Sequence, residues 1–297
     1  MTRPVLGPEL FSPPADEIGP PLGRPAGRSM RPLSQWPAAA RRALVGVFTD
    51  IDDTLTTDGA ITPDALQAMS LIGSAGLHMV AITGRPVGWS EPFAAAWPVD
   101  AIVAENGAVA LLPAPGGGLL KRYQQDAATR ERNFARMQAV LDRIEREIPG
   151  ARRSTDSPGR ECDIAIDHSE FAHLDDAQIA AVVALMRAEG MHATVSSIHV
   201  NGWYGEHNKL AGARWIVREL WGRELRDEMQ RWAYVGDSTN DALMFEHFDN
   251  SVGVANIRRF EAALTHLPHY VAQAERGAGF AEMARMLLGA RHRPSAA

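Results

Sequence analysis

Short apolar runs that end in polar residues alternate with helical patterns along most of the chain. The first run, Leu44 to Asp50, is almost unbroken in apolar side chains, which is typical of a strand buried on both faces. A helix is predicted to follow, with Thr62 as N-cap, Pro63 at its first position and Gly76 as its stop. The alternation continues through "DAIVAENGAVALL" and returns in the C-terminal third. The sequence therefore predicts an α/β fold with a doubly wound, parallel, Rossmann-like sheet.

The middle of the chain has a different texture. "LLPAPGGGLLKRY" is a break rich in glycine and proline, and beyond it the pattern predicts helices over 129–148 and 175–189 with one strand in "CDIAIDH" and one in "HATVSSIHV". We interpret residues 113–205 as an inserted α/β cap domain with an antiparallel sheet. Its insertion divides the Rossmann-like core into residues 41–112 and 206–290.

The two ends of the chain lie outside these predicted domains. Residues 1–40 hold nine of the nineteen prolines, which predicts a proline-rich, disordered extension. Its start has no apolar stretch typical of a secretory signal, and it contains Glu9, Asp16 and Glu17, which a transit peptide would avoid. Residues 291–297 are expected to form a short tail.

Composition limits the partners and the compartment. The formal net charge of −6 and the scattered arginines argue against nucleic acid or an anionic membrane as a partner. No apolar run approaches the roughly 20 residues needed to span a bilayer. Cys162 is the only cysteine, which excludes an intrachain disulfide and a cysteine-based zinc site. We expect a cytoplasmic protein that acts as a monomer or homodimer.

Carboxylates collect at the predicted carboxyl ends of the strands. Asp50 and Asp52 end the first strand, Asp237 ends "WAYVG", and Asp241 begins the next helix. In an open parallel sheet, ligands bind along this rim. Asp50, Asp237 and Asp241 would repel one another without a hard cation among them, and carboxylate oxygens are the ligands that Mg²⁺ prefers. The sequence therefore predicts a magnesium site.

Other polar residues at the same rim suit phosphate chemistry. Thr83 ends the second strand, Gly84 follows it, and Lys209 begins a helix that leads back into the core. Together with Mg²⁺, these groups would neutralise a phosphate dianion. Asp50 could then attack and form an aspartyl-phosphate. Asp52 suits a general acid that protonates the leaving group and afterwards deprotonates water.

The motifs "DIDDT", "TGR", Lys209 and "GDSTND" occur in this order. In them the chain resembles the haloacid dehalogenase-like (HAD) hydrolase superfamily, subclass IIB, the Cof-type and sucrose-phosphatase-like phosphatases with an α/β cap. "AENGA" and "SVGVANI" also look like that subclass, and the resemblance covers roughly residues 43–290. It implies these roles: Asp50 as nucleophile and metal ligand, Asp52 as acid/base and ligand through its carbonyl, Thr83 and Lys209 as phosphate binders, Asp237 and Asp241 as metal holders. Asp53 stands where many relatives have glycine, and we interpret it as a tolerated variant.

Four further residues are candidates for substrate contact. Arg85 in "TGRP" either contacts phosphate or pairs with a carboxylate. Arg160 lies in "RRSTDSPGRECD", which is either a solvated loop or a contact for an anionic substrate. His199 and Asn201 lie in "SIHVNGWYGEHNK" shortly before Lys209, where they would either contact a sugar or pack in the linker.

These observations predict a Mg²⁺-dependent phosphatase for a small phosphorylated metabolite, with sugar phosphates favoured. A cap that closes over the rim would exclude bulk water and macromolecular substrates. A sugar phosphomutase is the alternative enzyme, and it would produce an isomer instead of free phosphate. A regulatory phospho-acceptor module is a third hypothesis, but it needs neither the carboxylate of Asp52 nor a large insert.

Overall fold

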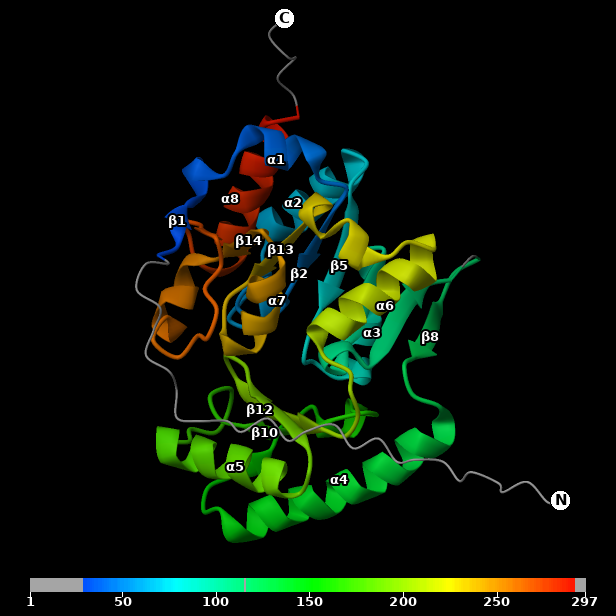
Figure 1. Cartoon of the computed structure of the whole chain (residues 1–297). Helices are drawn as coiled ribbons and strands as arrows, with labels where there is room; N and C mark the ends of the chain where they lie inside the picture. The colour runs from blue at the N-terminus through cyan, green and yellow to red at the C-terminus, as the bar shows by residue number, and fades with distance from the viewer. Residues whose placement is uncertain (1–28, 115, 292–297) are drawn as a thin grey trace, which may run out of the picture.

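The computed structural model describes residues 29–114 and 116–291, and a nine-stranded sheet forms its core (Figure 1). Neighbouring strands are parallel from β1 to β6 and antiparallel from β6 to β8. The strands, in their order across the sheet, are β1 (Arg31–Pro32), β15 (Tyr270–Val271), β14 (Asn250–Gly253), β13 (Trp232–Gly236), β2 (Gly46–Thr49), β5 (His78–Ile82), β6 (Ala101–Ala104), β7 (Val109–Pro113) and β8 (Leu119–Tyr123). The predicted doubly wound sheet is therefore present, with an antiparallel edge.

Helices cover both faces of this sheet because successive residues of each central strand point into two different apolar cores. Val47 of β2 packs in the core under α2, α3 and α8, and Phe48 packs in the core under α6 and α7. The helices of this domain are α1 (Ala38–Ala43), α2 (Pro63–Ser74), α3 (Val87–Ala96), α6 (Lys209–Trp221), α7 (Ala242–His247) and α8 (Arg276–Gly289). As predicted, α2 begins at Pro63 after Thr62.

A second, smaller layer lies beneath the core in Figure 1 and forms the cap. Its antiparallel sheet has the order β11-β12-β10-β9 and lies between the core and the two cap helices. The cap elements are α4 (Ala127–Glu147), β9 (Arg152–Arg153), β10 (Ile164–Asp167), α5 (Asp176–Ala188), β11 (His192–Val195) and β12 (His199–Trp203). The remaining short strands, β3 (Thr56–Thr57) and β4 (Ala60–Ile61), form a hairpin beside the rim.

The cap begins later in the chain than predicted. Strand β8 pairs along its whole length with β7 and extends the core sheet, so the insertion starts after Tyr123 and not at residue 113. The apolar run "DAIVAENGAVALL" forms two strands, β6 and β7. Glu105 and Asn106 adopt positive φ values of 49° and 55°, and this reversal turns β6 into the antiparallel β7.

The segment "HATVSSIHV", predicted as a single strand, is a β-hairpin. Strands β11 and β12 pair antiparallel around Ser196. The backbone N–H of Ser196 donates to the carbonyl of His199 at 2.8 Å, and the Ser196 hydroxyl accepts from the N–H of His199 at 3.0 Å. A serine hydroxyl therefore stabilises a turn that contains neither glycine nor proline.

The predicted extension over residues 1–40 is too long, because residues 29–40 belong to the core. Trp36 is only 1% exposed and its indole N–H donates to Asn250 at 2.9 Å, while Leu33 is also buried. Pro32 fits β1 because an edge strand tolerates a residue without an N–H. Residues 1–28 of the predicted extension and 292–297 of the predicted tail lie outside the described residues. None of the described helices has the length and apolar character to cross a membrane.

Candidate active site

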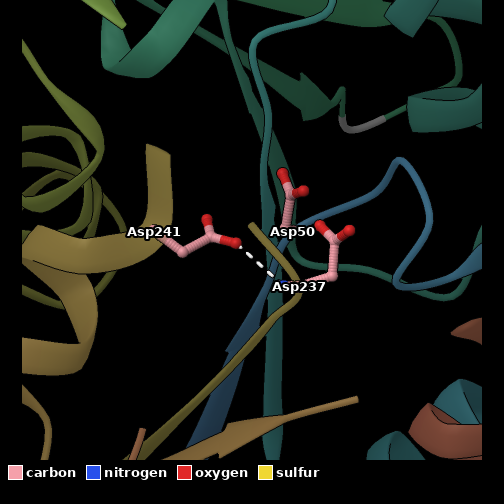
Figure 2. A group of neighbouring side chains, drawn as sticks. All are labelled: Asp50, Asp237 and Asp241. Atoms are coloured by element: carbon pink, nitrogen blue, oxygen red, sulfur yellow. Dashed lines mark hydrogen bonds between the residues drawn. The ribbon is translucent and has the colours of Figure 1, made fainter. Parts of the chain in front are cut away.

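Three carboxylates from distant parts of the sequence meet at the carboxyl ends of the central strands. Asp50 directly follows β2, Asp237 directly follows β13, and Asp241 ends the short helix η6 (Thr239–Asp241). All three are buried, and one oxygen of each lies within 4.8 Å of the others. Figure 2 shows the three side chains gathered in one space at this rim. The predicted convergence is therefore present in the fold.

Gly236 allows Asp241 to approach the backbone. A Cβ atom at position 236 would lie 2.3 Å from Asp241 Oδ2, so any larger residue would displace this carboxylate. In the space left free, Asp241 Oδ2 accepts the backbone N–H groups of Asp237 at 2.9 Å and Ser238 at 3.2 Å (Figure 2 draws the first). The loop after β13 thereby fixes its own carboxylate.

Lys209 is the cation of this cluster. It is the first residue of α6, and its buried Nζ donates to Asp50 Oδ1 at 2.8 Å and to Asp241 Oδ1 at 2.6 Å. Burial lowers the pKa of Lys209, but the carboxylates of Asp241 and Asp50 outweigh burial and raise it overall. Lys209 is therefore held as an ammonium against Asp50.

Asp237 has an oxygen that the protein leaves unsatisfied. Its Oδ2 accepts from the Asn256 amide at 3.0 Å, but its buried Oδ1 has no hydrogen-bond partner within residues 29–114 and 116–291. Burial, followed by the charges of Asp50 and Asp241, raises the pKa of Asp237 well above its usual range, and burial raises that of Asp50 to about 7. An unpaired buried carboxylate oxygen is costly, and a hard divalent cation would satisfy it. The residues present therefore fit a metal ion.

Asp52 and Arg85 form a second charged pair at the same rim. Arg85 Nε donates to both carboxylate oxygens of Asp52, at 2.9 and 3.0 Å. Burial raises the pKa of Asp52, and Arg85 partly opposes this. The buried hydroxyl oxygen of Thr83 accepts the backbone N–H of Arg85 at 3.0 Å. Of the two interpretations of Arg85, the structure shows the carboxylate pairing.

The cap completes the surroundings of Arg85. Its guanidinium Nη2 donates to Glu170 Oε1 at 2.9 Å, and Nη1 donates to Asp156 Oδ2 at 3.3 Å. His199 Nε2 lies 2.9 Å from Glu170 Oε2. His199 is therefore connected to the rim through Glu170, a residue that the sequence analysis did not single out.

Two other predicted residues of the cap donate hydrogen bonds to the same backbone carbonyl at the core rim. Arg160 Nη1 and the Asn201 amide donate to the carbonyl oxygen of Gly84, at 3.0 and 3.3 Å. Both also contact the buried carboxylate of Asp163. Arg160 is only 4% exposed, so its interpretation as part of a solvated loop is wrong.

Glu105 joins the core to the cap, and the sequence analysis assigned it no role. Its buried carboxylate accepts the backbone N–H groups of Val87 in the core and of Glu161, Cys162 and Asp163 in the cap. Burial is the main reason that the pKa of Glu105 rises to about 8. Its segment, "AENGA", resembles that of the family, but this resemblance alone assigns the glutamate no role.

An open cleft of about 410 Å³ lies between the core rim and the cap. Asp52, Arg85 and Arg276 line it from the core, and Glu170 and Phe171 line it from the cap. This volume lies within the range of small-molecule sites. The cleft therefore gives a ligand access to Asp52, next to the cluster of Asp50.

Comparisons with known proteins agree with this fold. Residues 47–132 match the family model described as haloacid dehalogenase-like hydrolase, whereas no curated protein matches significantly. A Thermoplasma acidophilum protein is 16% identical with a TM-score of 0.63, over 84% of this chain and 99% of that one.

Two solved phosphatases also have this fold. The sucrose-phosphatase from Synechocystis, solved with sucrose and phosphate, is 17% identical with a TM-score of 0.58, over 83% of this chain and 98% of that one. A HAD subclass IIB sugar phosphatase is 16% identical with a TM-score of 0.54, over 82% and 99%. The matched segment 47–132 contains Asp50, Asp52 and Thr83. Residues 47–132 therefore resemble the haloacid dehalogenase-like hydrolases in sequence, and the chain shares the fold of these solved phosphatases.

Proposed function

We propose that this protein is a Mg²⁺-dependent phosphatase that hydrolyses a small phosphate monoester, with a sugar phosphate as the preferred class. The observation that carries the proposal is the buried arrangement of Asp50: Lys209 donates to one of its oxygens, and Asp237, with its unsatisfied oxygen, lies beside it. A nucleophilic carboxylate needs cationic partners of this kind before it can approach a phosphate dianion.

In the first step, a carboxylate oxygen of Asp50 forms a bond to phosphorus while the bond from phosphorus to the leaving oxygen breaks. Asp52 donates its proton to that oxygen, a role that its raised pKa supports. Thr83, Gly84 and Lys209 would bind the phosphate oxygens. A divalent cation held by Asp50, Asp237 and Asp241 would offset the negative charge of the phosphate.

In the second step, water hydrolyses the aspartyl-phosphate. Asp52, now ionised, accepts a proton from the water as its oxygen bonds to phosphorus and the bond to Asp50 breaks. Free phosphate leaves and both carboxyl groups return to their starting states. The cap supports hydrolysis of small esters because it forms one wall of the cleft of about 410 Å³ that reaches Asp52.

Two relatives support a sugar phosphate as the substrate class. The sucrose-phosphatase and the subclass IIB sugar phosphatase share the fold over more than four fifths of this chain. Both act on phosphorylated sugars according to their names. Asn201 donates to the carbonyl of Gly84 at the core rim, and His199 contacts Glu170, which lines the cleft. These polar cap groups suit a hydroxyl-rich leaving group.

The test is phosphate release from p-nitrophenyl phosphate and a panel of sugar phosphates, with Mg²⁺ and with a chelator. We expect Mg²⁺-dependent release, and a loss of at least about a thousandfold in Asp50→Asn, because this change removes the nucleophile. Circular dichroism of the variant checks that the fold is intact. Full activity in Asp50→Asn would contradict the mechanism, sugar isomers without free phosphate would indicate a mutase, and a phosphoenzyme stable for hours would indicate a phospho-acceptor.

A further inference from the structure

Acidic side chains outnumber basic ones around the cleft beside Asp52. Arg85 is surrounded by three carboxylates, those of Asp52, Asp156 and Glu170. Among the described residues that line the cleft, the other cation is Arg276, and it forms ion pairs of 3.1 and 2.8 Å with two acidic side chains, those of Asp53 and Asp58. Each cation of the cleft wall is therefore already compensated or outnumbered.

We propose that Glu170 is a specificity-determining residue that excludes substrates whose leaving group carries a second negative charge, and favours neutral or cationic leaving groups. This inference rests on the proposed phosphatase function and narrows its substrate class. It concerns the part of the substrate that leaves, not the phosphate bound at Asp50.

Glu170 is held rigidly over the cleft by the loop that carries it. The buried carboxylate of Asp167 accepts four successive backbone N–H groups, from Ser169, Glu170, Phe171 and Ala172, at 2.8 to 3.1 Å. A carboxylate held by this many donors fixes the loop backbone. The Glu170 side chain therefore cannot withdraw from Arg85 without breaking a network that continues to His199.

The charges around Arg85 make a further anion unfavourable. A carboxylate of the substrate would have to replace Glu170 or Asp156 at the guanidinium and would then lie beside the displaced acid. Arg160 also forms an ion pair with Asp156, at 3.1 Å, but it pairs with Asp163 as well, so four carboxylates lie around two guanidinium groups. Like charges brought together at a desolvated contact repel each other strongly, so binding of such a substrate should be impaired.

A neutral or cationic leaving group meets the opposite situation. A sugar hydroxyl can donate to Glu170 without a charge penalty, and an ammonium group would add an attractive charge. Phe171, which is 71% exposed, and Ile198 supply apolar surface in the same cleft. This combination suits the alternating hydroxyl and C–H groups of a sugar.

The test compares three phosphate esters that share the C6 phosphate of a hexose skeleton and differ in charge elsewhere: glucosamine 6-phosphate, glucose 6-phosphate and 6-phosphogluconate. For the parent enzyme with Mg²⁺, we expect kcat/KM for the neutral and cationic esters to exceed that for 6-phosphogluconate at least tenfold. An ester that is not turned over is compared through its inhibition constant against p-nitrophenyl phosphate.

The variant Glu170→Gln keeps the size of the side chain and removes its charge. We expect the preference against 6-phosphogluconate to shrink at least about tenfold, mainly through KM. The preference is taken as the ratio of kcat/KM between esters measured on the same variant, so a general change in its rate cancels. The matched control is Glu131→Gln, an exposed residue of the same type on cap helix α4. It should leave the preference unchanged.

The outcomes separate this inference from the proposed function. Absence of Mg²⁺-dependent hydrolysis of p-nitrophenyl phosphate would overturn the phosphatase function itself. With that hydrolysis present, three results would overturn the inference alone. The first is equal kcat/KM values or equal inhibition constants for the three esters, and the second is neither turnover of nor inhibition by any of them. The third is a Glu170→Gln variant in which kcat/KM changes by the same factor for all three esters.

Discussion

Asp53 adopts a backbone conformation that is unfavourable for most residues other than glycine. Asp53 has a φ of 53°, a left-handed conformation that glycine adopts freely and aspartate tolerates better than most residues. Two contacts hold it there. Arg276 forms an ion pair with its carboxylate at 3.1 Å, and the Asn256 amide donates to its carbonyl at 3.0 Å. The aspartate in place of a glycine therefore pairs with the core and not with the cap.

This conformation predicts different effects for two small substitutions of Asp53. Asp53→Ala should lower the free energy of unfolding by about 1 kcal/mol or more, because alanine is strained at positive φ. Asp53→Gly loses the same ion pair but relieves the strain, so it should cost less. Urea denaturation of both variants measures the difference. Equal losses would show that the backbone conformation is not the determinant.

His207 is a second residue whose environment has a measurable consequence. It is buried, and within the described part of the chain neither of its ring nitrogens has a hydrogen-bond partner. Burial lowers the pKa of His207 to about 4, whereas an unfolded histidine titrates near 6.5. Between these values the unfolded chain binds the proton and the folded chain does not. The free energy of unfolding therefore falls as pH falls through this window.

We expect His207 alone to remove about 2 kcal/mol of stability between pH 7 and pH 5. Other acidic groups titrate over the same range, so the informative quantity is the difference between the parent and His207→Gln. The variant should lose less stability on acidification than the parent, as followed by urea denaturation at each pH. Parallel curves for the two proteins would mean that His207 is not buried in its neutral form.

At the scale of elements, the buried strands of the core can be predicted from the sequence. The turns that are stabilised by side-chain hydrogen bonds or by positive φ at residues other than glycine cannot. Asp50 and Asp237 could be placed because each directly follows a continuous apolar run, and in a parallel sheet such runs end at one rim. The reversal at Glu105 could not, because it lies inside an apolar run and depends on positive φ at two residues that are not glycine. The burial of Leu33 and Trp36 could not be predicted, because the surrounding prolines are typical of a disordered segment.

The cap side of the site was harder to predict for the same reason. Glu170 and Asp163 obtain their roles from contacts with Arg85 and Arg160, which lie on other elements. No local pattern distinguishes these acids from solvated ones. The motifs in the sequence locate the site residues at the core rim. They do not locate the cap residues that line the cleft for the leaving group.

The junction of core and cap depends on Glu105, and its removal should be costly. Glu105→Ala leaves four backbone N–H groups without their acceptor, at about 1–3 kcal/mol for each that water cannot reach. We expect a loss of at least about 3 kcal/mol in the free energy of unfolding. Glu105→Gln retains one accepting oxygen and should lose less. Guanidinium denaturation of the two variants measures this order, and the reverse order would contradict the role of the carboxylate as acceptor.

At the scale of the whole molecule, the repulsion of three buried carboxylates is a weakness of the metal-free fold. A cation that binds only the folded chain stabilises all of it, by about 2.7 kcal/mol at a hundred times its Kd. We therefore expect Mg²⁺ to raise the melting temperature by about 5 °C or more relative to a chelator. In Asp237→Asn this shift should disappear, whereas Glu131→Gln should retain it. A parent protein insensitive to Mg²⁺ would argue against the metal site.

The pairing of β1 with β15 protects one edge of the core sheet from pairing with another copy of the chain. Without residues 31 and 32, the backbone of β15 would present open N–H and C=O groups at the edge of an eight-stranded sheet. Another chain could add a strand to such an edge. The short proline-containing strand covers this edge, and Trp36 fastens the segment through Asn250. Residues 31–36 thus protect the sheet edge against self-association, and a version trimmed to start at Pro37 should aggregate at concentrations where the full chain stays dispersed.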